Sequence, residues 1–180
     1  INFINKETGE SAFMQAVNHH SPDIKMAHFL LSNGVADINL KNQIGRTALF
    51  NAVQNLNTEL VELLLAHGAD VNVKDNTDST LLHEAISSFR DSRSEEVEQR
   101  RQEVVRILLD KGADLAGIEK NLHPWMTPLS LAINKELPQI ALLLIERGAD
   151  PNDPTGNRKY DEYGNDYTVL MQAADYGMTD

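Results

Sequence analysis

Cysteine is absent from the 180-residue chain. The absence excludes a disulfide framework, a zinc site built on thiolates and a cysteine nucleophile, and it leaves the redox compartment open. Basic residues are also scarce, because 16 Lys and Arg stand against 27 Asp and Glu and the formal net charge is −11. Nucleic acids and anionic membrane surfaces are bound mainly through Lys and Arg, so this balance argues against both. A basic protein partner would fit it.

Long apolar runs and secretory signals are missing as well. Ile140–Ile145 is among the longest apolar stretches, far short of the roughly 18 residues of a membrane span. No signal-peptide pattern opens the sequence, but its first residue is Ile rather than Met. We therefore predict no membrane contact and make no prediction of localisation.

The sequence also lacks the motifs of common catalytic sites. His83-Glu84 begins like the zinc motif H-E-x-x-H, but position 87 is Ser instead of the second His. There is no complete phosphate-binding loop and no G-x-S-x-G turn. Acidic residues crowd the stretch 150–166, but Pro154 interrupts the calcium-loop pattern. We expect no enzyme activity, no metal ion and no cofactor.

What the sequence does contain is an internal repeat. One block occurs at Leu63–Asn72, Leu108–Leu115 and Leu143–Asn152, with a looser copy at Leu30–Asn39. A second block precedes it by about twenty residues, at Ser11–Ala16, Thr47–Ala52, Thr80–Ala85, Thr127–Ala132 and Thr168–Ala173. Thr47 and Gly68 are 21 residues apart, as are Thr127 and Gly148, and Thr47 and Thr80 are 33 apart. A period of this length indicates a solenoid of stacked units.

Through its T-x-L-x-x-A and L-L-x-x-G-A-D-x-N blocks, the sequence resembles the ankyrin-repeat family. The resemblance covers nearly the whole chain and implies one all-α domain over 1–180. That domain would be a solenoid of stacked helix-turn-helix units with short β-hairpin-like turns. The expected repeats are 6–41, 42–74, 75–121, 122–162 and a partial repeat at 163–180. One helix pair cannot bury its own apolar face, so stacking of neighbouring repeats should stabilise the fold. We expect a monomer, with further repeats or a domain beyond Asp180.

Several residues have an expected structural role. They are Thr47, Gly68, Thr80, His83, Gly112, Thr127, Pro128, Gly148 and Thr168. Each threonine stands where a first helix starts, and its hydroxyl can accept from a free backbone N–H. The proline suits the first helical position, and the glycines suit a left-handed helix end. The family resemblance gives the histidine a role in capping and bridging the backbones of adjacent repeats.

Two stretches depart from the period. The 80–112 spacing exceeds that of repeat two by eleven residues, which predicts an insertion near 90–102. A long turn is predicted at 151–166. Insertions in solenoids fall in loops, often on the binding face.

The first insertion has a helical pattern. Ser92 with Glu95 predicts a capping box, and Glu96 with Arg100 predicts an i, i+4 ion pair. We expect the second helix of repeat three to be longer by about eleven residues, or roughly 16 Å. The charge pattern fits two roles of the extended helix equally well: a surface beside the groove that contacts a partner, or a solvated, salt-bridged projection.

Aromatic residues gather late in the chain, with all four tyrosines at or beyond position 160 and the single tryptophan at 125. In the ankyrin family, partners meet the turn tips and the inward face of the first helices. The resemblance therefore implies non-catalytic protein binding through a concave groove, mainly in repeats three to five, where interface-enriched residue types lie. The expected partner-binding residues are Arg46, Asn76, Thr77, His123, Trp125, Met126, Lys135, Asn165, Tyr167, Asp175 and Tyr176.

Other interpretations remain open. The repeats could be the targeting arm of a larger multidomain protein or enzyme, or a structural spacer whose groove binds nothing. Trp125 fits a packing role as well as a binding role, because large aromatic side chains are usually mostly buried.

Overall fold

A computed structural model describes residues 4–18, 23–34, 36–88, 94–115 and 127–152. The chain divides into two compact units, Ile1–Ala113 and Asp114–Asp180, and each is described by itself. Within the described ranges the secondary structure is eight α-helices and two isolated antiparallel bridges. None of these helices combines the length and apolar content needed to cross a bilayer.

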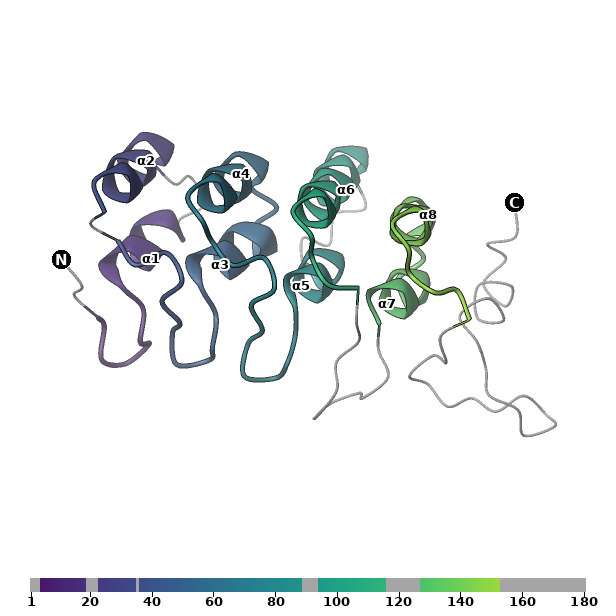
Figure 1. The fold of residues 1–180 in the computed structure, drawn as a ribbon, viewed down its shortest axis with the longest axis horizontal. Coiled ribbons are helices and arrows are strands. Elements are labelled where there is room, and N and C mark those ends of the chain that lie inside the picture. Colours follow the sequence, from purple (N-terminus) through teal and green to yellow (C-terminus); the bar gives the residue numbers. More distant parts are fainter. Residues whose placement is uncertain (1–3, 19–22, 35, 89–93, 116–126, 153–180) are drawn as a thin grey trace. The chain divides into compact units, whose positions relative to one another are not determined.

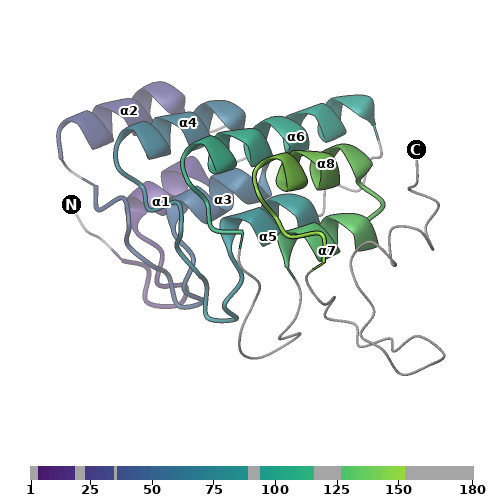
Figure 2. The same ribbon diagram turned by 45° about the vertical axis from the view of Figure 1, so that its right-hand side comes forward.

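Three helix pairs form the first unit (Figure 1). They are α1 (Ala12–Val17) with α2 (Ile24–Ser32), α3 (Ala48–Gln54) with α4 (Thr58–Ala66), and α5 (Leu81–Ser87) with α6 (Glu95–Asp110). First helices pack on first helices, α1 on α3 and α3 on α5, while α2 packs on α4 and α4 on α6. Figure 2 shows the two resulting layers of this unit. The all-α stacked fold predicted from the repeats is confirmed.

In the described residues of the second unit, α7 (Pro128–Asn134) and α8 (Pro138–Glu146) form a helix pair and pack against each other. Pro128 occupies the start of α7, where its missing N–H costs no hydrogen bond. The residues of the expected partial repeat, including Thr168, lie outside the described part of the chain.

The first helices begin directly after the hydroxyl residues of the repeat block. In α5 the Thr80 hydroxyl accepts from the backbone N–H of His83, and in α7 the Thr127 hydroxyl accepts from Ser130 (3.4 and 3.1 Å). Thr47 precedes α3 in the same way but makes no such bond. Its hydroxyl is buried and has no hydrogen-bond partner among the described residues. The cap expected at Thr47 is therefore not formed.

The second helices end at the glycines of the other block. Gly68, Gly112 and Gly148 have φ of +88°, +84° and +97°, the left-handed region that favours glycine. After α4, the N–H of Ala69 donates to Leu64 O at 3.0 Å, which satisfies a carbonyl of the last turn. The chain changes direction at this glycine and enters the turn that leads to the next repeat.

Leucine and other apolar side chains on the facing sides of the helices make the core of the first unit. Those buried to 1% exposure or less include Leu49, Phe50, Leu60, Leu64, Leu82, Ile86 and Leu108. Burying one such side chain contributes about 2 kcal/mol, so the contacts between repeats dominate the stability of the stack.

The longest helix differs in detail from the sequence prediction. Helix α6 has 16 residues where α4 has nine, so it is extended by seven residues and not by eleven. The other four lie in its connection from α5. Its N-cap is Ser94, whose hydroxyl accepts from Val97 N–H at 3.4 Å, rather than Ser92. Three glutamates in the first turn favour this start, because carboxylates there face the positive end of the helix dipole.

Candidate interaction surface

The turns of the first unit are hydrogen-bonded to one another. Gln43 N–H donates to Thr8 O at 3.1 Å, and Asn76 N–H donates to Ile44 O at 3.0 Å. The Asn76 side chain adds a bond to Gln43 O at 2.8 Å. Gly45 has φ +80°, and a Cβ there would lie 2.7 Å from Asn76 N, so only glycine allows the turns to approach this closely. The turn tips therefore form a ladder with fixed spacing.

Arg46 joins the second and third helix pairs. Its Nη2 lies 2.9 Å from Glu84 Oε2 on α5, and its Nε lies 3.3 Å from Asp75 Oδ2 in the following turn. The guanidinium also lies over the Phe50 ring, 5.5 Å from the centroid. About a fifth of the Arg46 side chain is exposed, whereas the two carboxylates are almost buried. We refer to Arg46, Asp75 and Glu84 as the Arg46 network.

The pKa of Glu84 is raised above its ordinary value of 4.5. Burial is the largest cause, because it penalises the charged carboxylate. The charge of Arg46 opposes the rise, the charge of Asp75 adds to it, and hydrogen bonds from Arg46 and Gln54 lower the pKa. The network thus places two carboxylates, both almost buried, next to one guanidinium.

The predicted binding residues in the described part of the chain have different environments. Asn76 and Thr77 are exposed at the turn tip, and the Thr77 hydroxyl donates to Asp75 Oδ1 at 2.6 Å. Arg46 is tied into its network and presents only part of its side chain. Lys135 is an exposed residue that ends α7 in the second unit.

Seven of the predicted binding residues lie outside the described part of the chain. They are His123, Trp125, Met126, Asn165, Tyr167, Asp175 and Tyr176.

Asp75 and Glu84 were not among the residues predicted from the sequence. A signal was present, because Arg46 immediately precedes one threonine of the repeat and Glu84 follows the next threonine by four positions. Opposite charges at these positions of adjacent repeats can meet once the first helices stack.

His83 lies in the interior of the first unit, 3% exposed, with its Nδ1 2.7 Å from the Thr80 hydroxyl. The corresponding residue of α3 is Phe50, whose side chain carries no polar atom, so Thr47 has no counterpart of the contact between Thr80 and the His83 ring. Within the described ranges, no group of three or more His, Asp or Glu side chains is placed to hold a metal ion.

The side chain of Arg101, on α6, binds carbonyl groups at the end of helix α5. It is 8% exposed, and its Nη1 donates to Ala85 O at 3.1 Å and Ile86 O at 2.8 Å. In α3 the corresponding carbonyls, Ala52 O and Val53 O, accept instead from backbone N–H groups of the short turn that follows (3.0 and 2.9 Å). The guanidinium therefore donates to the two α5 carbonyls that correspond to those bonded by the short turn after α3.

Two further ion pairs lie on the surface of α6. Glu96 with Arg100 (2.5 Å) and Glu103 with Arg106 (2.6 Å) are exposed ion pairs. The first of these pairs was predicted from the sequence. Exposed pairs of this kind contribute little to stability and suit a solvated face.

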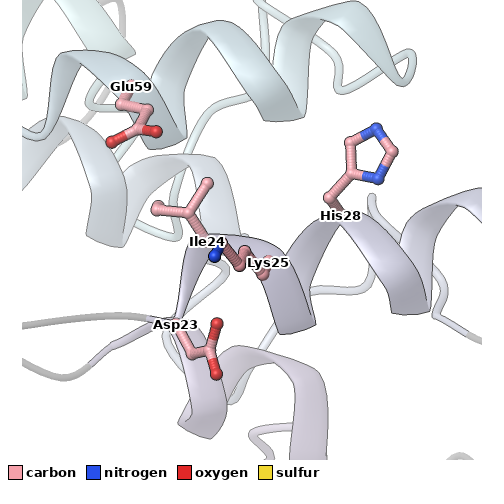
Figure 3. Close-up of a pocket in the computed structure, with 5 residues that line it drawn as sticks. All are labelled: Asp23, Ile24, Lys25, His28 and Glu59. Carbon is pink, nitrogen blue, oxygen red and sulfur yellow. The ribbon is translucent and has the colours of Figure 1, made fainter.

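A hollow of about 600 Å³ lies between the starts of α2 and α4. Figure 3 shows its lining: Asp23, Ile24, Lys25, His28 and Glu59. The Asp23 carboxylate already caps α2 by accepting from Met26 N–H at 3.0 Å. The His28 ring packs edge-to-face with His67, with centroids 5.4 Å apart. Four of the five lining side chains are charged or polar and exposed, and they define no particular ligand.

A stack of short helix pairs joined by hydrogen-bonded turns defines a helical repeat protein. The family pattern described as "Ankyrin repeats (3 copies)" matches residues 13–117, and the single "Ankyrin repeat" pattern matches residues 125–156. The chain belongs to the ankyrin-repeat family. Ankyrin repeats generally mediate protein–protein interaction, and the family is typically non-catalytic.

Curated relatives show the same similarity. Ankyrin repeat and SOCS box protein 6 of Homo sapiens is 28% identical over 169 residues, covering 85% of this chain and 38% of that protein. B-cell lymphoma 3 protein homolog of Mus musculus is 29% identical over 143 residues, covering 79% and 29%. The ankyrin repeat protein FPV219 of Fowlpox virus (strain NVSL) is 33% identical over 149 residues, covering 69% and 34%. The chain thus spans less than two fifths of the length of each of these relatives.

Proposed function

We propose that this chain is a non-catalytic module that binds another protein through its turn tips and the inward face of its first helices, mainly in repeats three to five. The observation that carries binding through the turn tips is the ladder between the first three turns, in which Gln43 and Asn76 bond to the preceding turns, whereas the emphasis on repeats three to five rests on the aromatic residues of the sequence. A surface fixed before binding loses little conformational entropy on association, so a few anchors suffice for affinity. Among the described tips, Ile44 is an apolar side chain that is 55% exposed.

The net charge of −11 favours a basic partner. An acidic field accelerates the encounter with such a partner and makes the association rate fall as salt is added. The Arg46 network contributes to this preference, because its two carboxylates exceed its single positive charge.

The test is affinity capture from a lysate of the source cell with the 180-residue chain as bait. Trp125→Ala/Tyr167→Ala is the binding variant, and Glu62→Ala, at an exposed position of α4, is the matched control. A thermal melt first establishes that both variants fold. We expect a protein that is retained by wild type and by the control but lost from the double variant. Equal recovery by all three baits contradicts the proposed site and favours a spacer.

A second candidate is that these repeats are the targeting arm of a larger protein. The name of one relative, Ankyrin repeat and SOCS box protein 6, joins the repeats to a further element, and this chain spans 38% of that relative. In that case the partner captured by the bait would be a substrate or anchor of a separate functional part. Sequencing the complete reading frame distinguishes this candidate from a free-standing module.

A further inference from the structure

Helix α2 exposes apolar side chains that its counterparts bury. Met26 is 48% exposed, whereas the residues in the same register, Leu60 of α4 and Val104 of α6, are 1% and 0% exposed. Phe29 is 60% exposed, whereas its counterparts are less exposed, Leu63 of α4 being half-buried and Ile107 of α6 9% exposed. The counterparts are more buried because a preceding second helix packs on them, α2 on α4 and α4 on α6.

The first helix of the same pair shows the same difference. Ala16 of α1 is exposed, while the alanines in its register, Ala52 of α3 and Ala85 of α5, are 1% and 0% exposed. Alanine at this position leaves room for a neighbouring helix to approach closely. We call Ala16, Met26 and Phe29 the α1/α2 outer face; it lies at the end of the stack marked by α1 and α2 in Figure 1.

The turn beside this face is built like the turns that follow it. Asn5 accepts from the N–H two residues later (2.9 Å), as Asp75 does in the third turn (2.9 Å). The residue after the Asx position donates its N–H to the preceding turn at Gln43 and at Asn76. Lys6 holds the same position in the first turn and is exposed at the free edge of the ladder, within the described part of the chain.

We infer that the α1/α2 outer face docks another helix pair of the same repeat type, which belongs to the same polypeptide. The second and third helix pairs each pack one surface against the pair before them. The first pair has the corresponding positions on the α1/α2 outer face and in its turn, so this face continues the established interface. The end of a stack that meets water is expected to be polar, and this face is not. The inference rests on this face and is independent of the proposed function.

An occupant joined to the same backbone suits the apolar area that is exposed. Met26 and Phe29 together expose on the order of 200 Å² of apolar surface. A helix pair joined through the backbone loses little entropy on docking, so a small apolar face is enough to hold it.

Thiol labelling tests the inference, because the 180-residue chain contains no cysteine. Met26→Cys and Phe29→Cys are introduced into the protein isolated at its natural length and into the 180-residue chain. Glu62→Cys, at an exposed position of α4, is the matched control. Labelling with a maleimide is followed by mass spectrometry on the peptide that carries each substituted position.

We expect positions 26 and 29 to label at least about tenfold more slowly than the control in the natural-length protein, because labelling then requires local opening. In the 180-residue chain, the three positions should label at similar rates. Equal rates in the natural-length protein would overturn the inference. Protection that appears in the 180-residue chain and grows with its concentration would also overturn it, because a second copy would then be the occupant.

Discussion

Replacing Arg46 with methionine removes the single positive charge of the Arg46 network while keeping much of the apolar stem. Glu84 and Asp75 then remain as two carboxylates whose side chains are only 8% and 5% exposed. Breaking a buried ion pair by removing one partner costs about 3 to 5 kcal/mol. Because about a fifth of Arg46 is exposed, water can replace part of the lost interaction. We expect Arg46→Met to lower the free energy of unfolding by about 2 to 3 kcal/mol.

Urea unfolding at neutral pH measures this change, with the slope m expected to stay constant. Arg100→Met is the matched control, since its ion pair with Glu96 is exposed on both sides and should contribute less than about 0.5 kcal/mol. Adding Glu84→Gln to Arg46→Met should restore part of the loss, because it removes one uncompensated carboxylate. A loss below about 1 kcal/mol for Arg46→Met would refute the argument that the network links the two repeats energetically.

The pH dependence of stability follows from the raised pKa of Glu84. The folded state binds the Glu84 proton more tightly than the unfolded state, so this group's contribution to stability is complete below its ordinary pKa of 4.5. It is lost as pH rises through the raised, folded-state pKa. Arg46→Met removes two influences that lower this pKa, so its stability should fall more steeply with rising pH than that of wild type. Glu84→Gln should abolish this component, and equal pH profiles for wild type and Glu84→Gln would contradict the assignment.

The remaining predictions concern the framework. Thr47→Val removes a buried hydroxyl that has no partner among the described residues, and it should raise the free energy of unfolding by about 1 kcal/mol. Thr80→Val loses the bond to His83 and should lower the free energy of unfolding by a similar amount. A loss of stability in both variants would contradict the argument. Glu136→Gly relieves a left-handed backbone at φ +56° and should raise the melting temperature, whereas Glu146→Gly at the last residue of α8 should lower it as the control. Arg101→Met removes the guanidinium bonds to two carbonyls of α5 and should cost about 2 kcal/mol, and faster amide exchange confined to α5 would localise the effect.

The sequence predicted the parts of the fold that follow local rules. The starts of α5 and α7 and the left-handed glycines after the second helices depend on residues within one turn of the chain, so the repeat blocks were sufficient. Thr47 departs from the rule, since its hydroxyl makes no cap bond although α3 begins directly after it. The start of α6 was placed two residues too early, since Ser92 and Ser94 both resemble caps when the tertiary structure is unknown.

The contacts between repeats were harder to predict. Arg46 was selected for its position at a turn tip, but its bonds to Glu84 depend on how α3 and α5 stack, across 38 positions of sequence. Arg101 gave no sequence signal for its role, because the carbonyls it binds lie on another helix, 15 and 16 positions earlier. The predicted aromatic binding residues, led by Trp125 and Tyr167, stay a prediction.

Arg101 has a consequence for how this protein can change over time. In repeats two and four the turn after the first helix both caps that helix and sets the distance to the second, so its length cannot vary freely. In repeat three a side chain from α6 donates to the carbonyls at the end of α5. These bonds come from Arg101 and not from the connection itself, so we expect them to persist when residues are gained or lost between positions 88 and 94. This connection is the natural place in the first unit for evolution, or a protein engineer, to graft a new loop.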